Sequence, residues 1–81
     1  MSICYSDSDN KLVMINDVKD ISYGMISEAQ GCGLIVTKGD RRYGCAMSSG
    51  EAVRYLELTR RQLRDNPAGI AFIDVPLEAV A

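Results

Sequence analysis

The sequence predicts a small α+β fold, in which one helix packs across one face of a mostly antiparallel sheet of four or five strands. Three observations predict this fold class. Short segments alternate apolar and polar residues, polar or glycine-containing turns separate them, and one amphipathic segment follows a helix-capping signature. The 81 residues allow one domain, residues 1–81, with the element order β-β-β-β-α-β.

The N-terminal part of the chain carries the pattern of a hairpin followed by a further strand. Residues 2–5 and 11–15 are short apolar segments, and the polar cluster 6–10 between them has side chains that favour turns by bonding to nearby backbone. Residues 21–25 then alternate apolar side chains with serine and glycine, which is the period of a half-buried strand. We therefore expect strands at these three places.

A second hairpin has the clearest strand pattern in the chain. Residues 34–37 are apolar and β-branched, and a tight turn with glycine at 38–40 leads into the alternating residues 43–47. A turn is expected at 28–33, before this hairpin. Residues 70–75, after the helix, form the last expected strand.

The helix is the most strongly marked element. Ser48 and Glu51 match a capping box, in which the serine oxygen accepts from the amide of Glu51 and the glutamate reaches back to the amide of Ser48. The helix therefore starts at residue 49 or 50, and it stops at Asn66 because the residue before a proline resists helical geometry. One stripe should cover the sheet: Ala52, Leu56, Thr59 and Leu63, widened by Val53 and Tyr55.

The apolar residues exceed what a single helix can bury. Four isoleucines fall on strand positions opposite to those expected to face the helix: Ile15, Ile26, Ile35 and Ile73. On the helix, Leu58 lies about 130° from the centre of the buried stripe, where it forms an apolar flank with Tyr55, although single exposed leucines are common. A second copy of this small chain would bury such groups. The candidate interface therefore comprises Tyr55, Leu58, Ile26 and Ile35.

Charge and composition exclude several classes of function. The formal net charge of −2 is the opposite of the basic balance with which proteins bind duplex DNA. The chain has no histidine, which removes Ser-His-Asp, Cys-His and H-E-x-x-H chemistry together. Cys4, Cys32 and Cys45 are odd in number and form no C-x-x-C, so we expect reduced thiols in a cytoplasmic protein. No apolar run is long enough to span a bilayer, and we expect no membrane partner.

Two further motifs favour ordinary structure over chemistry. Asp7 and Asp9 resemble the start of a calcium loop, but Lys11 and Leu12 occupy positions that need an oxygen ligand and a glycine. The triplet Gly31-Cys32-Gly33 could expose a reactive thiol, yet no base accompanies it. We expect no catalytic residue, no metal and no cofactor.

The positions of the arginines suggest an alternative function, binding of single-stranded nucleic acid. Arg41 and Arg42 precede Tyr43, a composition typical of platforms for single-stranded nucleic acid, although strand alternation puts Arg42 and Tyr43 on opposite faces. Further arginines lie on the outer face of the helix, where Glu57 allows the ion pairs of an ordinary solvated surface. The candidate basic patch comprises Arg41, Arg42, Arg54, Arg61 and Arg64.

Together these patterns favour a small non-catalytic domain that acts by binding another protein, as a homodimeric accessory, regulatory or inhibitory protein. The alternative is a protein that binds single-stranded nucleic acid through a sheet face bearing arginine and tyrosine. Binding to single strands that falls steeply with salt would favour the alternative, because phosphate contacts release counterions.

Overall fold

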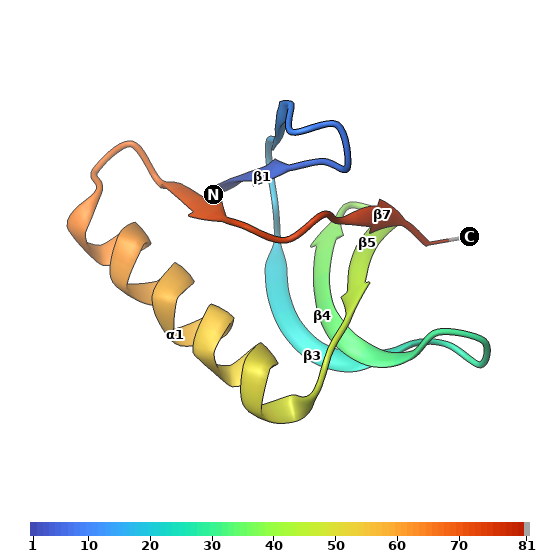
Figure 1. The fold of residues 1–81 in the computed structure, drawn as a ribbon. Coiled ribbons are helices and arrows are strands. Elements are labelled where there is room, and N and C mark those ends of the chain that lie inside the picture. The colour runs from blue at the N-terminus through green and yellow to red at the C-terminus, as the bar shows by residue number, and fades with distance from the viewer. Residues whose placement is uncertain (81) are drawn as a thin grey trace.

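The computed structural model describes residues 1–80, and these residues form an α+β fold of two sheets and one helix (Figure 1). In chain order the elements are β1 (Ser2–Ser6), β2 (Leu12–Ile15), β3 (Asp20–Ser27), β4 (Gly31–Lys38), β5 (Arg41–Ala46), α1 (Ser49–Asp65), β6 (Ile70–Ile73) and β7 (Glu78–Ala79). The α+β class and the broad order of elements are confirmed. The strands form two sheets where one was expected.

The small sheet has the strand order β2-β1-β6, and the large sheet has the order β3-β4-β5-β7. In the small sheet β1 pairs antiparallel with β2 and parallel with β6, which joins it after the helix. All pairs of the large sheet are antiparallel. Figure 1 shows the large sheet curving below the small sheet, with α1 along one side of both.

Local turn chemistry explains both expected hairpins. The Asp7 carboxylate accepts from the backbone amides of Asp9 and Lys11, at 2.9 Å each, which closes the β1–β2 turn. Asp7 is thus a turn residue. Between β4 and β5, Lys38 pairs with Arg41, and Gly39 in the turn has φ of 60°, a conformation that glycine adopts without strain.

The hydrophobic core lies between the two sheets and the helix. Ile3 and Ile73 from the small sheet and Leu34 and Val36 from the large sheet are fully buried in one cluster. The helix covers the cluster with the expected stripe, of which Ala52 and Thr59 are buried and Tyr55, Leu56 and Leu63 are half-buried against the core. The predicted inward face of α1 is confirmed, except that Val53 is about half exposed.

The four isoleucines expected to lack cover are buried within the single chain, so this expectation was wrong. Ile15 and Ile73 belong to the inner face of the small sheet. Ile26 and Ile35 lie on the other face of the large sheet and are 5% and 6% exposed, because the sheet carries glycines there. A Cβ at Gly44 would lie 3.2 Å from the Ile26 side chain. The isoleucines fill the space over these glycines, so burying them needs no second copy.

The capping box is confirmed at Ser48, with one difference. The Ser48 hydroxyl oxygen accepts from the Glu51 amide at 3.3 Å, and the hydroxyl lies 3.4 Å from the Glu51 carboxylate. The carboxylate therefore meets the serine side chain, and Ser48 closes the first turn of α1. At the other end, the expected stop is confirmed because the helix ends at Asp65 and Asn66 has extended geometry.

Replacing Ser48 by alanine should lower the free energy of unfolding by about 1 kcal/mol, because the amide of Glu51 loses its acceptor. Urea denaturation measures this effect. Ser48→Asp is the matched control, since aspartate also caps helices and should preserve most of the stability. A Ser48→Ala midpoint equal to the wild-type midpoint would show that the cap does not stabilise the helix.

The chain continues in ordered structure beyond residues 70–75, the last strand that the sequence predicts. Leu77 is buried, and Glu78–Ala79 pair with β5 as β7. The Val80 amide also donates to the carbonyl of Arg42 at 2.9 Å, which holds this segment on the large sheet. Ala81 lies outside the described residues.

Candidate functional site

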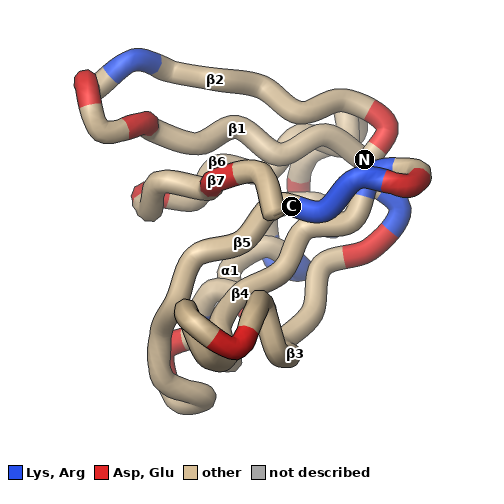
Figure 2. Tube along the Cα trace, turned by 90° about the vertical axis from the view of Figure 1, so that its right-hand side faces the viewer, with Lys and Arg blue, Asp and Glu red and all other residues tan. Residues whose placement is uncertain are grey.

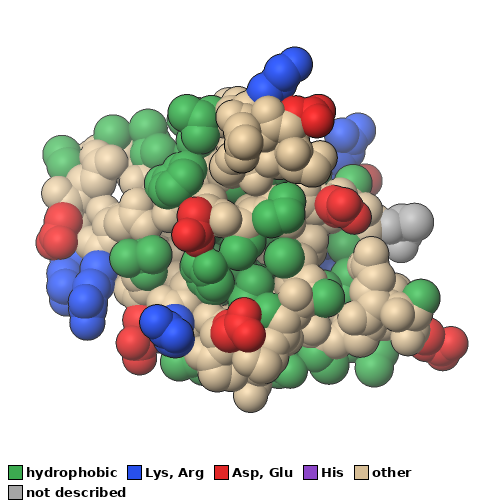
Figure 3. Space-filling view, viewed as in Figure 1, with side chains coloured by type: hydrophobic (Ala, Val, Ile, Leu, Met, Phe, Trp, Pro, Cys, Tyr) green, Lys and Arg blue, Asp and Glu red, His purple; other side chains and the backbone are tan. Residues whose placement is uncertain are grey.

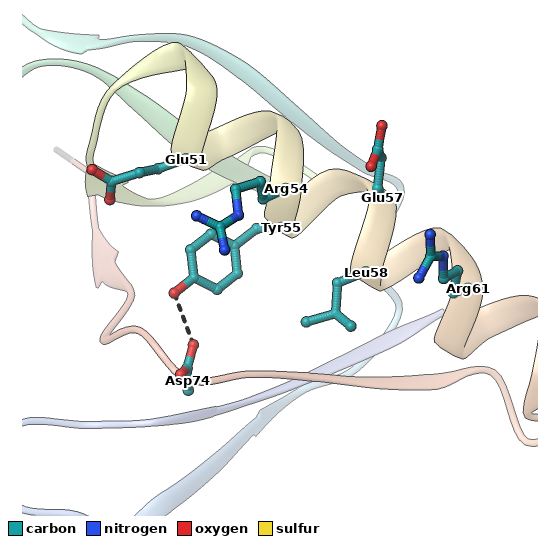
Figure 4. Close-up of a pocket in the computed structure, with 7 residues that line it drawn as sticks. All are labelled: Glu51, Arg54, Tyr55, Glu57, Leu58, Arg61 and Asp74. Atoms are coloured by element: carbon teal, nitrogen blue, oxygen red, sulfur yellow. Dashed lines mark hydrogen bonds between the residues drawn. The ribbon is translucent and has the colours of Figure 1, made fainter.

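A groove of about 690 Å³ lies between α1 and the segment that follows β6. Tyr55 and Leu58 point from the helix towards this segment (Figure 4). The Tyr55 hydroxyl donates to the Asp74 carboxylate at 2.8 Å, and this bond fixes the helix against the segment. The structure therefore brings together the two helix residues of the predicted interface.

The hydrogen bond to Asp74 is the main reason that the pKa of Tyr55 is raised above its ordinary value, and burial adds to it. A tyrosine phenol is protonated at neutral pH, and the raised pKa favours that form further, so Tyr55 acts as a hydrogen-bond donor in the groove. Asp74 was not singled out in the sequence. Its role depends on the path of the chain after β6, which no local pattern indicates.

The charged side chains around the groove have both signs. The cations are Arg54 and Arg61, and the acids are Glu51, Glu57 and Asp74. Such a mixture surrounds the apolar pair of Tyr55 and Leu58 with polar groups, as at the rim of a protein–protein interface. It does not concentrate positive charge for a phosphate.

The five arginines of the predicted basic patch are distributed over two elements. Arg54 and Arg61 line the groove on α1, whereas Arg41 and Arg42 begin β5. The guanidinium of Arg42 donates to the backbone carbonyl of Met25 at 2.8 Å. Arg64 lies 3.7 Å from the carboxylate of Asp65, in an exposed ion pair of little energetic weight.

The outer face of the small sheet carries a row of apolar side chains that the sequence did not single out. Phe72, Cys4 and Met14 are direct partners across β6, β1 and β2, so they lie side by side. Phe72 is 41% exposed and Met14 is 47% exposed, and Leu12 further along β2 is 70% exposed. We call Phe72, Cys4, Met14 and Leu12 the apolar row.

The helix that carries Leu58 is bonded to the edge of β6. Gln62, one helical turn after Leu58, exchanges two hydrogen bonds of 2.8 Å with the backbone of Phe72. Leu58 itself faces the groove that Asp74 also lines (Figure 4). In the space-filling view, hydrophobic side chains gather between the helix and the small sheet (Figure 3). Gln62 thus links the helix that carries the flank to the strand that carries Phe72.

The three cysteines are free thiols in separate places. Cys32 lies in β4, where a turn was expected, and its partner across the sheet is Met25. Burial, and then the nearby carboxylates of Glu78 and Glu51, raise the pKa of the Cys45 thiol. A raised pKa disfavours the thiolate, which is the nucleophilic form.

Over residues 1–80, no three side chains of the ligand types His, Cys, Asp and Glu come together as a metal site. Over the same residues, no helix combines the length and the apolar character needed to cross a bilayer.

Comparison with known proteins gives no relative from which a function could be inferred, so the proposal below rests on the surface described above. No protein-family model, curated protein or solved structure matches the chain. The features that remain are the apolar row, the flank of Tyr55 and Leu58, and the mixed-charge groove that this flank lines.

Proposed function

We propose that the chain is a small non-catalytic domain that acts as a homodimer and binds another protein through the outer face of its small sheet. The observation that carries this proposal is the apolar row, in which large apolar side chains are exposed next to each other. Single exposed apolar residues are normal on a protein surface, whereas contiguous ones are typical of interaction sites.

The composition of the surface supports a protein as the partner. Phenylalanine and methionine are enriched at the centres of protein interfaces, and Phe72 and Met14 supply both in the apolar row. The groove on α1 has charged groups of both signs, and the helix that carries them is bonded to β6 through Gln62, so these groups supply a polar rim. An apolar centre with a polar rim is the usual anatomy of such an interface.

The placement of the arginines supports a protein over a nucleic acid. Arg42 uses its guanidinium on the carbonyl of Met25, and Tyr43 packs against the core, so neither is presented as a stacking platform. Arg54 and Arg61 lie among three carboxylates, which reduce the local positive potential.

The test uses the protein as bait in a lysate of its source cells, with Phe72→Lys as the variant. Lysine keeps the backbone of β6 and its bonds to Gln62, but it places a charge in the apolar row. We expect the wild type to retain a protein at high salt and Phe72→Lys to retain at least about tenfold less, since desolvating a charge opposes binding. Val53→Lys is the matched control, because Val53 is also about half exposed but lies outside the row.

Two results would contradict the proposal. One is retention of the same proteins by the wild type and Phe72→Lys. The other is tight binding of a single-stranded oligonucleotide that falls steeply with salt and is lost in Arg41→Glu, since this would identify phosphate contacts as the source of affinity.

A further inference from the structure

Over residues 1–80 the two sheets have four outer strands, and the chain protects three of them. On β6, the Gln62 side chain both donates to and accepts from the backbone of Phe72, so it occupies the position of a neighbouring strand. The outer strand β7 has only two residues, and β3 carries a register shift between Met25 and Ser27. Short strands and bulges are the usual devices against pairing at an edge.

The fourth outer strand, β2, has none of these devices. Its sequence Leu-Val-Met-Ile contains no charge, no proline and no glycine, and its pairing with β1 is in register throughout. Among the described residues it pairs only with β1, and it forms the upper border of the molecule in Figure 2. An open, regular, apolar outer strand is the feature by which another strand can be added to a sheet.

The hydrogen-bond pattern shows which backbone groups of β2 are unpaired. Asp7 donates its amide to the carbonyl of Lys11, which makes these two residues a hydrogen-bonded pair. Antiparallel ladders alternate, so Val13 and Ile15 also bond to β1. The amides and carbonyls of Leu12 and Met14 therefore face away from the sheet.

We propose that β2 of two copies pairs antiparallel about a two-fold axis at Met14, joining the two small sheets into one six-stranded sheet. This inference rests on the proposed function, in which the chain is a homodimer, and it assigns the contact between the two copies to β2. Met14 of each copy then exchanges backbone hydrogen bonds with Met14 of the other, through groups that β1 leaves free.

The charges at the two ends of β2 favour a second copy of this chain as the partner that pairs with its open edge. Lys11 precedes β2 and Asp17 follows it, so the strand has a cation near one end and an anion near the other. The antiparallel register centred on Met14 places Lys11 opposite Asp17 of the second copy, and the symmetry repeats this pair. A parallel arrangement would instead bring like charges together, which disfavours it.

The pairing also enlarges the surface proposed for the partner protein. Met14 is a member of the apolar row, so the two rows meet at the axis. The dimer presents a continuous apolar face across both copies. The edge of β2 forms the contact between the two copies, and the outer face of the small sheet remains free to bind the partner protein.

The experiment measures the molar mass of wild type and Met14→Pro by light scattering after size exclusion at micromolar concentration. Proline removes the amide hydrogen that faces away from β1, so the single chain loses no ladder bond and tolerates the change. We expect the wild type to have twice the chain mass of 8.9 kDa and Met14→Pro to have the mass of one chain. Met14→Leu keeps the amide and should remain dimeric, as should Leu58→Arg.

Amide hydrogen exchange of the wild type gives a second test that needs no variant. The amides of Leu12 and Met14 should exchange at least about tenfold more slowly in concentrated solution than in dilute solution, because pairing protects them. The amides of Val13 and Ile15 should be protected in both, since they bond to β1.

The outcomes separate the two proposals. A dimeric Met14→Pro, or exchange of Leu12 and Met14 that is equally fast at both concentrations in a dimeric wild type, overturns the β2 contact and leaves the homodimer in place. A monomeric wild type overturns both. Loss of the dimer in Leu58→Arg but not in Met14→Pro would assign the contact to the helix flank.

Discussion

Replacing Gly33 by alanine is expected to unfold the protein or to lower its free energy of unfolding by about 4 kcal/mol or more. A Cβ at this position would clash with the carbonyl oxygen of Cys45 and would lie 2.8 Å from the Cα of Ala46. Both atoms belong to the backbone of β5, so no side chain can move aside. The strands β4 and β5 would have to separate, and β4 carries the fully buried Leu34 and Val36.

Gly50→Ala is the matched control, because it adds the same methyl group at a position in α1 where, outside the neighbouring residues and the helix's own backbone, no atom lies within 4 Å. Alanine favours the helix over glycine, so this variant should be more stable than the wild type by up to about 1 kcal/mol. Urea denaturation at one chain concentration measures both variants. A Gly33→Ala variant with a midpoint close to that of the wild type would show that β4 and β5 do not approach so closely.

The second large effect is expected for Ile3→Ala, at about 2–5 kcal/mol of lost stability. Ile3 is fully buried on β1, the central strand of the small sheet, where its neighbours are Ile15 and Ala71. Its side chain belongs to the cluster that joins the two sheets. Truncation leaves a cavity at this junction that neither sheet can close alone.

Ile3→Val provides the graded control at the same site, because it removes one methylene and should cost about 0.5–1.5 kcal/mol. Thermal and urea denaturation of the two variants should therefore give the order wild type, Ile3→Val, Ile3→Ala. Equal stabilities for Ile3→Ala and wild type would contradict the placement of the core between the two sheets.

The sequence predicted the elements whose signals are local. The capping pair of Ser48 and Glu51, the stop before Pro67 and the apolar stripe placed α1 correctly. The turn residues Asp7 and Gly39 marked both hairpins. Each of these signals acts over a few residues, so it can be read without knowing the rest of the fold.

The division into two sheets could not be read in this way. It depends on β6 pairing in parallel with β1 across almost the whole chain, and nothing near Ile70 or Ser2 specifies that partner. Alternation also failed to identify the inner face of β6. Phe72 and Ile73 are both large and apolar, and a pattern of period two does not show which of them is buried.

The candidate site was predicted only in part, because local patterns give the direction of helix side chains but not the buried face of a strand. Tyr55 and Leu58 were singled out because a helical wheel gives their direction relative to the stripe. Phe72 and Met14 were missed, because their exposure follows from the choice of inner face, and Gln62 looked like an ordinary polar helix residue. Residues 12–15 are apolar on both faces of the strand, and this pattern was the signal that one apolar face of the small sheet could be exposed.

The molar mass of the wild-type protein in solution decides whether this chain acts as a homodimer. Light scattering after size exclusion at micromolar concentration should give twice the chain mass of 8.9 kDa. A mass of 8.9 kDa that does not rise with concentration would contradict the homodimer.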